Sequence, residues 1–363
     1  MKRNWLSYMC MAALLSGALT SCNESSFLNL SDPNHFTESN FWKDKADAES
    51  ALAAAYSPIK GAMYGYFSAF DGWLNLNGRG DDIFTIKGEE VPMWNIANFL
   101  NSPSTGNDPY GALYSGIQRA NIVLRYIDQI PASGITEEDR SMIKGEALFL
   151  RGYQYFLLVN NYKEVPLRLI PSNEDETNKG PASEAALWTQ VEEDLGNAIK
   201  CNLPVERTTA KERVTKGAAI AMLGKVYATQ HKYPEAKQLL VSLLSAPYSY
   251  ELVDDFAKNF TNEEEFNKES VYEIAYSPDG EYSWSNESGI CLGCYIPQFI
   301  GPVKSGGWAK LMPNSFIVGE FTKETRPNGA DTNFDKRIYA SLFFDPANYG
   351  DKVANEKWYG NNY

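Results

Sequence analysis

Residues 136–160, TEEDRSMIKGEALFLRGYQYFLLVN, have the pattern of a long helix with one apolar side. The hydroxyl of Thr136 can cap the first turn, and the acidic residues 137–139 suit the positive end of the helix dipole. Apolar side chains then recur at spacings of three and four, at Ile143, Ala147, Leu150, Tyr153 and Leu157. The sequence therefore predicts a helix from Thr136 to about residue 160 that buries this side in a core.

Further helices are predicted on both sides of this one. An Ala-rich segment that begins at Phe41 and reaches Tyr56 has a strong helix propensity. Helical spacing of apolar residues recurs over residues 110–127, and Ser183 can cap another helix that reaches about residue 199. The predicted helices therefore come in pairs.

One helix pair has the signature of a known repeat. Its residues fit the second part of the tetratricopeptide pattern, with Leu223-Gly224-x-x-Tyr227 followed by Tyr233, Ala236 and Leu240. In that repeat a small residue lets two antiparallel helices touch. The match alone also fits any helical hairpin, but several adjacent helix pairs favour the repeat. We expect a mostly α fold in which residues 41–246 form a tetratricopeptide-like helical scaffold.

Two loop-rich excursions interrupt or follow this scaffold. The first, at about residues 65–109, holds many Gly, Asn, Asp and Pro residues, which predict loops and short elements. Residues 247–363 are expected to be irregular, and within them Val271–Tyr276 alternates as a strand does. The second excursion, residues 277–315, is rich in Gly, Pro and aromatic residues. Long loops on a rigid frame commonly carry function.

The first 22 residues have the parts of a bacterial export signal. A positive start precedes an apolar run from Trp5 to Leu19, which is too short to span a membrane. Leu19-Thr20-Ser21-Cys22 resembles a lipobox, in which the cysteine is acylated and the chain is cut before it. The sequence predicts a signal peptide at residues 1–21, a lipid anchor at Cys22 and a polar tether over residues 22–40. An ordinary signal peptide with an accidental cysteine is the alternative.

Charge and metal-ligand content disfavour several classes of protein. The formal net charge of −13 becomes −15 when Lys2 and Arg3 leave with the signal peptide, so the surface should repel nucleic acid. The two histidines form no cluster with cysteines from which a zinc site could be built. Cys201, Cys291 and Cys294 do not make a disulfide framework. We expect no cofactor and no metal site.

Four local motifs suggest chemistry, and each has a plainer explanation. Glu146 and Arg151 are predicted to be a buried polar pair that braces helix packing, and not a catalytic pair. Cys291-Leu-Gly-Cys294 has the spacing of half a zinc ribbon or of a redox pair, but a local disulfide or two thiols is preferred. Arg79-Gly80-Asp81 follows Asn77-Gly78 and is predicted to form a turn.

A possible calcium loop is the fourth motif. Asp331-x-Asn333-x-Asp335 resembles the start of an EF-hand loop. However, Lys336 stands where that loop requires glycine, and Leu342 stands where it requires glutamate. The sequence therefore does not support calcium binding.

The long predicted helix also contains a segment typical of a known family. The Gly-Glu-Ala-x-Phe-Leu-Arg-x-Tyr-x-Tyr-Phe block from Gly145 to Phe156 resembles that of the SusD/RagB family. Other segments resemble the family in similar order, namely Tyr114-x-x-Ile117-x-x-Ala120-Asn121, Asp194-Leu195, Thr215-Lys216-Gly217-Ala218-Ala219 and Asp335-x-Arg337. The resemblance runs from Cys22 to near the end of the chain.

The resemblance implies a SusD-like fold and a lipoprotein of the outer membrane, displayed on the cell surface. It also implies a partner, a SusC-like TonB-dependent transporter, which imports the glycans, or in some members the peptides, that the lipoprotein captures. Family members usually continue well past this length and complete the last helical repeat. Because residues 358–363 show no terminating helix, we expect this sequence to be partial.

Aromatic residues in the two excursions are the candidate binding residues. A flat ring can cover the C–H face of a sugar while polar groups nearby bind its hydroxyls. The candidates are Trp73, Trp94, Tyr282, Trp284 and Trp308. Each ring could instead only pack against its own loop, so a binding site requires that several of these rings lie together on one surface. We predict an exposed platform for a neutral or weakly charged glycan, because the acidic surface disfavours anionic ligands.

These observations predict a surface-exposed glycan-binding lipoprotein that is not an enzyme. A peptide-binding RagB-like lipoprotein is the alternative on the same scaffold. A tethered glycoside hydrolase would need two opposed carboxylates about 5–9.5 Å apart, and no motif indicates such a pair. A tetratricopeptide adaptor, with its ligand in the helical groove, is the last alternative.

Overall fold

The computed structural model describes the helical part of the chain almost completely and the excursions in part. The described residues are 41–60, 67, 72, 77–85, 91–100, 109–172, 174–277, 293, 296–303, 306–323, 335, 337–342, 357–358 and 361–362. The chain divides into two compact units, Met1–Lys43 and Asp44–Tyr363. In the first, the rings of Phe41 and Trp42 lie edge to face with centroids 5.3 Å apart. The predicted signal peptide, Cys22 and the tether lie outside the described residues.

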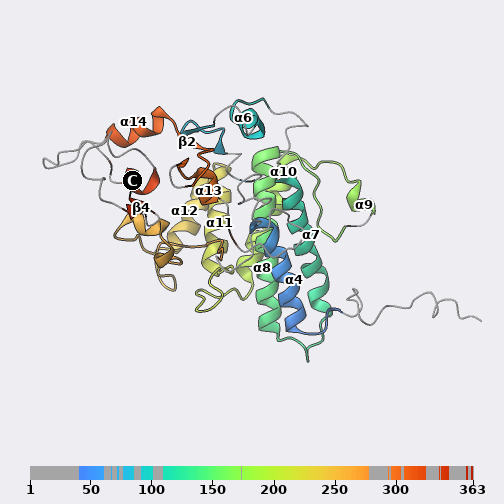
Figure 1. The fold of residues 1–363 in the computed structure, drawn as a ribbon. Coiled ribbons are helices and arrows are strands. Elements are labelled where there is room, and N and C mark those ends of the chain that lie inside the picture. Colours follow the sequence, from blue (N-terminus) through green and yellow to red (C-terminus); the bar gives the residue numbers. More distant parts are fainter. Residues whose placement is uncertain are drawn as a thin grey trace, which may run out of the picture. The chain divides into compact units, whose positions relative to one another are not determined.

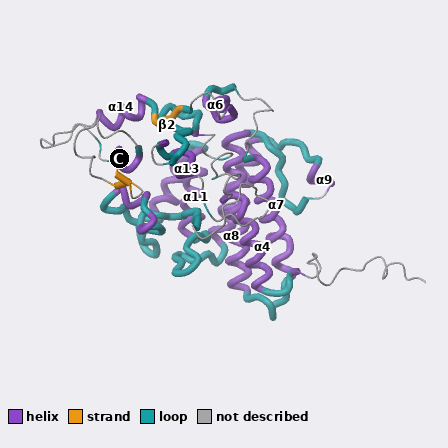
Figure 2. The backbone as a smooth tube through the Cα atoms, viewed as in Figure 1, coloured by secondary structure: helices purple, strands orange, loops and turns teal. Residues whose placement is uncertain are grey.

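Six helices of the second unit pack against one another in chain order (Figures 1 and 2). They are α4 (Lys45–Lys60), α7 (Tyr110–Tyr126), α8 (Glu137–Tyr162), α10 (Glu184–Lys200), α11 (Lys216–Thr229) and α12 (Tyr233–Ser242). Each contacts the next, and α8 also contacts α4 and α11. The predicted mostly helical, tetratricopeptide-like scaffold is therefore confirmed. Among the described residues, no helix is both long enough and apolar enough to cross a membrane.

Short elements connect or follow these helices. They are η1 (Ile127–Gln129), α9 (Glu174–Thr177), η2 (Phe256–Phe260), η3 (Asn262–Glu264), α6 (Val91–Ala97), α13 (Ile296–Ile300), α14 (Ser315–Lys323) and α15 (Ile338–Ser341). In the part of the chain that the structure describes, four short strands form two antiparallel ladders, β1 (Ile83–Phe84) with β2 (Met312–Pro313) and β3 (Lys357–Trp358) with β4 (Asn361–Asn362).

Contacts at the helix ends show that neighbouring helices run in opposite directions. The amide of Lys45 donates to the carbonyl oxygen of Gly134 at 3.0 Å, so α4 begins beside the turn that joins α7 to α8. The ammonium of Lys163, just after α8, lies 3.1 Å from the Glu184 carboxylate at the start of α10. Each pair is therefore an antiparallel hairpin, and the first excursion is inserted between the two helices of the first pair, α4 and α7.

Side-chain caps set where the helices begin. The hydroxyl of Thr136 accepts from the amide of Asp139 at 3.1 Å, and that of Ser183 accepts from Ala186 at 3.3 Å. Both caps were predicted from the sequence. A third hydroxyl, that of Thr215, caps α11 in the same way, because the first amides of a helix have no partner within it.

The core is centred on α8. Ile143, Ala147 and Leu150 are fully buried, as predicted, whereas Tyr153 is half-buried and stacks on Phe149. Buried residues also occur on the other sides of α8, at Phe149, Tyr155, Phe156, Leu158 and Val159. The predicted single apolar side is too narrow, because α8 is surrounded by four other helices of the scaffold.

Glycines allow the closest helix contacts. A β-carbon at Gly224 would lie 2.7 Å from the side chain of Leu240, so α11 and α12 touch at this glycine. A β-carbon at Gly116 in α7 would lie 1.6 Å from the amide oxygen of Gln154 in α8. The predicted close contact at Gly224 is confirmed, and it is the contact that the repeat pattern requires.

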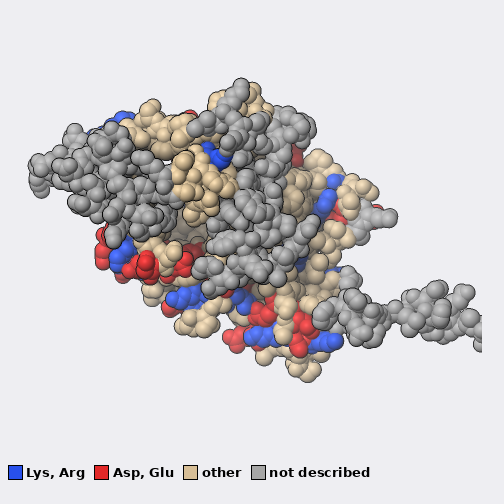
Figure 3. Space-filling view, in the orientation of Figure 1, with Lys and Arg blue, Asp and Glu red and all other residues tan. Residues whose placement is uncertain are grey.

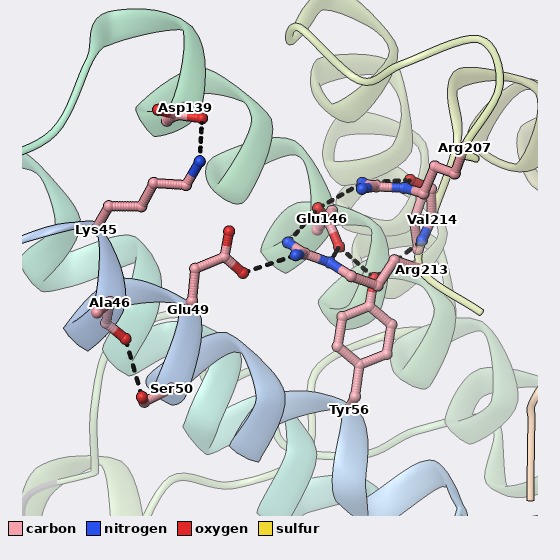
Figure 4. Close-up of polar contacts among 10 residues, drawn as sticks. All are labelled: Lys45, Ala46, Glu49, Ser50, Tyr56, Asp139, Glu146, Arg207, Arg213 and Val214. Carbon is pink, nitrogen blue, oxygen red and sulfur yellow. Dashed lines mark hydrogen bonds and ion pairs between the residues drawn. The ribbon is translucent and has the colours of Figure 1, made fainter. Parts of the chain in front are cut away.

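A buried carboxylate ties the loop before α11 to α4 and α8 (Figure 4). Glu146 is fully buried and accepts from Arg207 at 2.7 Å, from Arg213 at 2.7 and 2.9 Å, and from the Tyr56 hydroxyl at 2.6 Å. Arg213 also lies 2.7 Å from the carboxylate of Glu49. Burial, with the Glu146 carboxylate close by, raises the pKa of Tyr56 well above its usual value. Two arginines and two glutamates thus balance in charge.

A second buried network joins α7, α8 and α10. The guanidinium of Arg151 donates to both carboxylate oxygens of Asp194, at 2.6 and 2.8 Å, and to the side-chain oxygen of Asn121 at 2.9 Å. Asn121 in turn donates to the carbonyl oxygen of Arg168 at 3.0 Å. The hydroxyl of Tyr155 donates to that same carbonyl at 2.8 Å and holds the loop that follows α8.

The predicted pairing of Glu146 with Arg151 is therefore wrong. Five residues along an α-helix place two side chains about 140° apart around its axis, so the two groups face different neighbours. Each has its own oppositely charged partners, and each is buried between helices. The predicted bracing of helix packing applies to the two residues separately.

The predicted strand over Val271–Tyr276 is also wrong. This segment is irregular, and its aromatic residues contact the helical scaffold. The ring of Tyr272 meets Phe149 edge to face at 5.4 Å, and the hydroxyl of Tyr276 lies 2.9 Å from the carbonyl oxygen of Lys60. The alternation therefore reflects side-chain packing without a ladder, because no described strand lies beside this segment.

Candidate ligand-binding site

The two excursions meet in the structure through strands that lie more than 200 positions apart in the chain. Ile83 in β1 pairs with Pro313 in β2, and Phe84 pairs with Met312. β1 belongs to the first excursion and β2 to the second. The sequence predicted that both excursions extend from the helical scaffold. The pairing of β1 with β2 shows that they lie side by side. The surface around β1 and β2 is therefore the candidate ligand-binding site.

The first excursion is fastened to the scaffold just before β1. The amide of Gly80 donates to the carbonyl oxygen of Asn77 at 2.8 Å, which closes the turn predicted at Arg79-Gly80-Asp81. The guanidinium of Arg79 donates to the side-chain oxygen of Asn161 at 2.9 Å. Asn161 lies in the last turn of α8, so this turn connects β1 to the central helix.

Asn314 links the turn to the second excursion. Its backbone amide donates to the carbonyl oxygen of Asp82 at 3.0 Å, and its side-chain amide donates to the carbonyl oxygen of Asp81. Its side-chain oxygen accepts from the amides of Phe316 at 2.9 Å and Ile317 at 3.2 Å, at the start of α14. One side chain therefore caps a helix and binds the other excursion.

The segment from α13 to β2 presents Trp308. The half-buried indole lies edge to face on Phe299, which is fully buried, with ring centroids 6.1 Å apart. The amide of Trp308 donates to the carbonyl oxygen of Gln298 at 2.8 Å, and the Gln298 side chain donates to Gly306 at 3.1 Å. These contacts form a compact loop that holds one aromatic side chain at the surface.

Glycine is required inside this loop. A β-carbon at Gly307 would lie 2.1 Å from the carbonyl oxygen of Gly301, so any larger residue would open the loop. Ala309 has a φ of 47°, a conformation that is uncommon for residues with side chains. Such backbone geometry persists only where surrounding contacts hold it, and it is often found at functional sites.

Only two of the five predicted binding residues lie in the described part of the chain. Trp94 is half-buried on α6, which begins seven residues after Phe84, and Trp308 lies in the second excursion. Trp73, Tyr282 and Trp284 lie outside the described residues. The meeting of β1 with β2 brings the two excursions together, and convergence of all five rings stays a prediction.

The part of the second excursion that follows Glu287 has few charges. Residues 288–319 contain two lysines and no acidic residue, in a chain with 46 Asp and Glu. Apolar side chains are exposed at and after the ladder: Phe84 in β1 is 44% exposed, and Phe316, three residues after β2, is 55% exposed. In the same excursion Val303 is 71% exposed. In Figure 3 the charged atoms of the visible face gather mainly over its lower part, and the upper part is mostly uncharged where it is described. The β2 side of this surface suits a neutral ligand, whereas the exposed Asp81 and Asp82 stand directly before β1.

Metal and thiol chemistry find little support in the described residues. No group of three or more His, Cys, Asp or Glu side chains there could hold a metal ion. Asp335, from the calcium-like motif, accepts from the amide of Arg337 at 2.9 Å and from its guanidinium at 2.7 Å, whereas Asp331 and Asn333 lie outside the described residues. Burial raises the pKa of the Cys201 thiol. Cys291 and Cys294 also lie outside the described residues.

Sequence reasoning missed Asn314, Gln298 and Phe299. The run Pro313-Asn314-Ser315 before apolar residues is a helix-cap signal, so Asn314 as a cap was visible in the sequence. Its bonds to Asp81 and Asp82 had no sequence signal, because they join positions 232 or more residues apart.

Two family models match the chain. A model described as starch-binding and associating with the outer membrane matches residues 80–228, and a SusD family model matches residues 268–363. The first match includes α8 with its Gly145–Phe156 block, and the second includes the whole second excursion.

Similar proteins agree with these matches. SusD-like protein P38 of Formosa agariphila is 26% identical over 234 residues, which are 63% of this chain and 43% of that protein. The crystal structure of a SusD superfamily protein from Bacteroides vulgatus is 30% identical with a TM-score of 0.70, over 82% of this chain and 61% of that one. A laminarin-binding SusD-like protein is 30% identical with a TM-score of 0.61, over 68% of this chain and 54% of that one.

The chain spans from about two fifths to three fifths of the length of these relatives. Within that span the two matched regions and the similar solved structures agree with one family. The protein belongs to the SusD/RagB family.

Proposed function

We propose that this protein is a glycan-binding lipoprotein of the outer-membrane surface, and that its binding site is the surface around β1 and β2. The observation that carries the proposal is the ladder that brings the two aromatic-rich excursions together. The family description as starch-binding and the laminarin-binding relative support a neutral glycan as the ligand class.

Trp308 is the proposed stacking residue. Its ring rests on Phe299 and is partly exposed, so one part is held and another can meet a ligand. Aromatic rings cover the C–H face of a sugar, and the few charges in residues 288–319 avoid the cost of desolvating charged groups on binding. Trp94, Trp73, Tyr282 and Trp284 are proposed to extend the platform.

The proposal includes an anchor and a partner. Acylation of Cys22 would attach the protein to the membrane, since two or more acyl chains hold a protein durably. A SusC-like TonB-dependent transporter is the proposed partner that imports the captured oligosaccharide. No reaction is proposed for the site, and bound glycan is expected to be released unchanged.

Calorimetry with a panel of ligands tests the proposal. The panel is laminarihexaose, laminarin, soluble starch, the anionic glycan alginate, and a mixture of tryptic casein peptides. We expect binding of at least one neutral glycan, no binding of alginate, and no new reducing ends after prolonged incubation. Binding of the peptides alone would instead support the RagB-like alternative, and release of reducing ends would support a hydrolase.

A further inference from the structure

We infer that Asn314 is a positioning residue of this binding surface: it joins the two excursions, so that glycan affinity depends on it without contact to the ligand. This inference rests on the proposed function. It concerns a residue that is not aromatic and that no sequence pattern associates with sugar binding.

The geometry of the Asn314 side chain is the first argument. Its side-chain nitrogen donates to the carbonyl oxygen of Asp81 in the first excursion. Its side-chain oxygen accepts from the amides of Phe316 and Ile317 in α14. Its backbone amide adds a bond to Asp82. An asparagine side chain has both a donor and an acceptor, and here each serves a different segment.

The weakness of the ladder is the second argument. β1 and β2 have two residues each, and Pro313 has no amide hydrogen to donate. An isolated two-stranded ladder is marginally stable at best. The bonds made by Asn314 come directly after the ladder and extend it, so among the described residues they contribute a large share of the contacts between the excursions.

The route from the scaffold to Trp308 is the third argument. Arg79 is bonded to Asn161 in α8, and the turn that follows Arg79 ends at Asp81 and Asp82. Asn314 binds that turn, and Trp308 lies six residues before Asn314 in the same chain segment. The first excursion therefore positions Trp308 relative to α8 through Asn314.

Two substitutions separate the link from the helix cap. Asn314→Asp keeps a side-chain oxygen that can cap α14 but removes the amide that donates to the Asp81 carbonyl. Asn314→Ser also keeps a capping oxygen, on a shorter side chain without that amide. The matched control is Asn267→Asp. Asn267 also accepts a backbone amide, that of Glu269, and donates to a second group, the Asn259 side chain, and it lies outside both excursions.

The readouts are calorimetry with laminarihexaose and hydrogen exchange of the ligand-free protein. Asn314→Asp and Asn314→Ser should weaken binding about threefold to tenfold, as expected for loss of one hydrogen bond. Backbone amides of residues 82–84, 308–312 and 314 should exchange faster in both variants, while those of α8 stay unchanged. Asn267→Asp should match the wild type in both measurements.

A double-mutant cycle then tests the route to Trp308. If Asn314 positions that ring, Trp308→Ala should reduce affinity less in the Asn314→Asp background than in the wild type. Wild-type affinity and exchange in both Asn314 variants would overturn the inference and leave the proposed function intact. If the wild type does not bind laminarihexaose but binds another neutral glycan of the panel, the same variants are measured with that glycan. A wild type that binds none overturns both the proposed function and this inference.

Discussion

Trp308 has a half-buried ring, and backbone hydrogen bonds are made by its own amide and by that of the next residue. Its amide donates to Gln298 at 2.8 Å, and the next amide, of Ala309, donates to Gly301 at 2.9 Å. A ligand that stacks on this ring meets a side chain already held in place, so little conformational entropy is lost on binding.

Trp308→Ala should therefore lower glycan affinity about tenfold, and Trp94→Ala should lower it as well if α6 contributes to the platform. Trp188→Phe, in α10 of the scaffold, is the control and should bind as the wild type does. Calorimetry with the glycan that the wild type binds is the measurement. Undiminished affinity in both Trp→Ala variants, and in the matching variants of Trp73 and Trp284, would eliminate the platform.

The buried hydroxyl of Tyr56 should make the stability of the protein depend on pH in the alkaline range. Its pKa is raised by burial and by the Glu146 carboxylate, so the folded protein keeps the hydroxyl protonated where the unfolded chain ionises it. The free energy of unfolding should therefore fall as pH rises above about 10, the usual tyrosine pKa. Urea unfolding between neutral pH and pH above 10 measures this, and Tyr56→Phe should have a shallower decline. Equal slopes in the two proteins would contradict the assignment.

At the scale of elements, the helix pairs depend on small residues where two helices touch. α11 and α12 meet at Gly224, where Leu240 occupies the space that a side chain would need. Gly196 in α10 has open space around its α-carbon and serves as the comparison. The same substitution at these two glycines thus separates helix contact from helix propensity.

Gly224→Leu should destabilise the protein by about 1–3 kcal/mol, because the added side chain overpacks the α11–α12 contact. Gly196→Leu should be neutral or stabilising, since leucine is a better helix former than glycine. Urea denaturation of the two variants and the wild type is the measurement. If both variants unfold at the same urea concentration, the α11–α12 contact is not the tight one described above.

At the scale of the whole molecule, the excursions enter and leave the scaffold at defined points. The first leaves from the end of α4 and returns at the start of α7, and the second follows α12 and the irregular segment whose Tyr276 contacts Lys60. The loops that carry the aromatic residues are thus mounted on α4 and α8, whose buried polar networks hold the scaffold.

The proposed anchor is tested on the whole protein in cells. Cys22→Ser should release the protein from the membrane fraction, because an unacylated chain lacks the lipid that holds it there. Fractionation followed by immunoblotting measures this, and Cys201→Ser is the control that should stay with the membrane. Membrane retention of Cys22→Ser equal to that of the wild type would show that the anchor lies elsewhere.

The sequence by itself determined the helical scaffold. Apolar spacing, the hydroxyl caps at Thr136 and Ser183, and the small residue at Gly224 predicted helices whose ends the structure confirms within a few residues. These signals are local, because a helix satisfies its backbone within one segment and shows its buried side at a regular spacing.

The tertiary structure alone decided the partners of buried charges and the meeting of the excursions. Nothing within five residues of Glu146 indicates Arg207 and Arg213, and the alternation at Val271–Tyr276 predicted a strand that has no partner to form it. The bonds of Asn314 to Asp81 and Asp82 likewise join distant positions. Such contacts depend on where the packed helices place the loops. The sequence gives the separation of residues along the chain, but it does not give their distance in the folded protein.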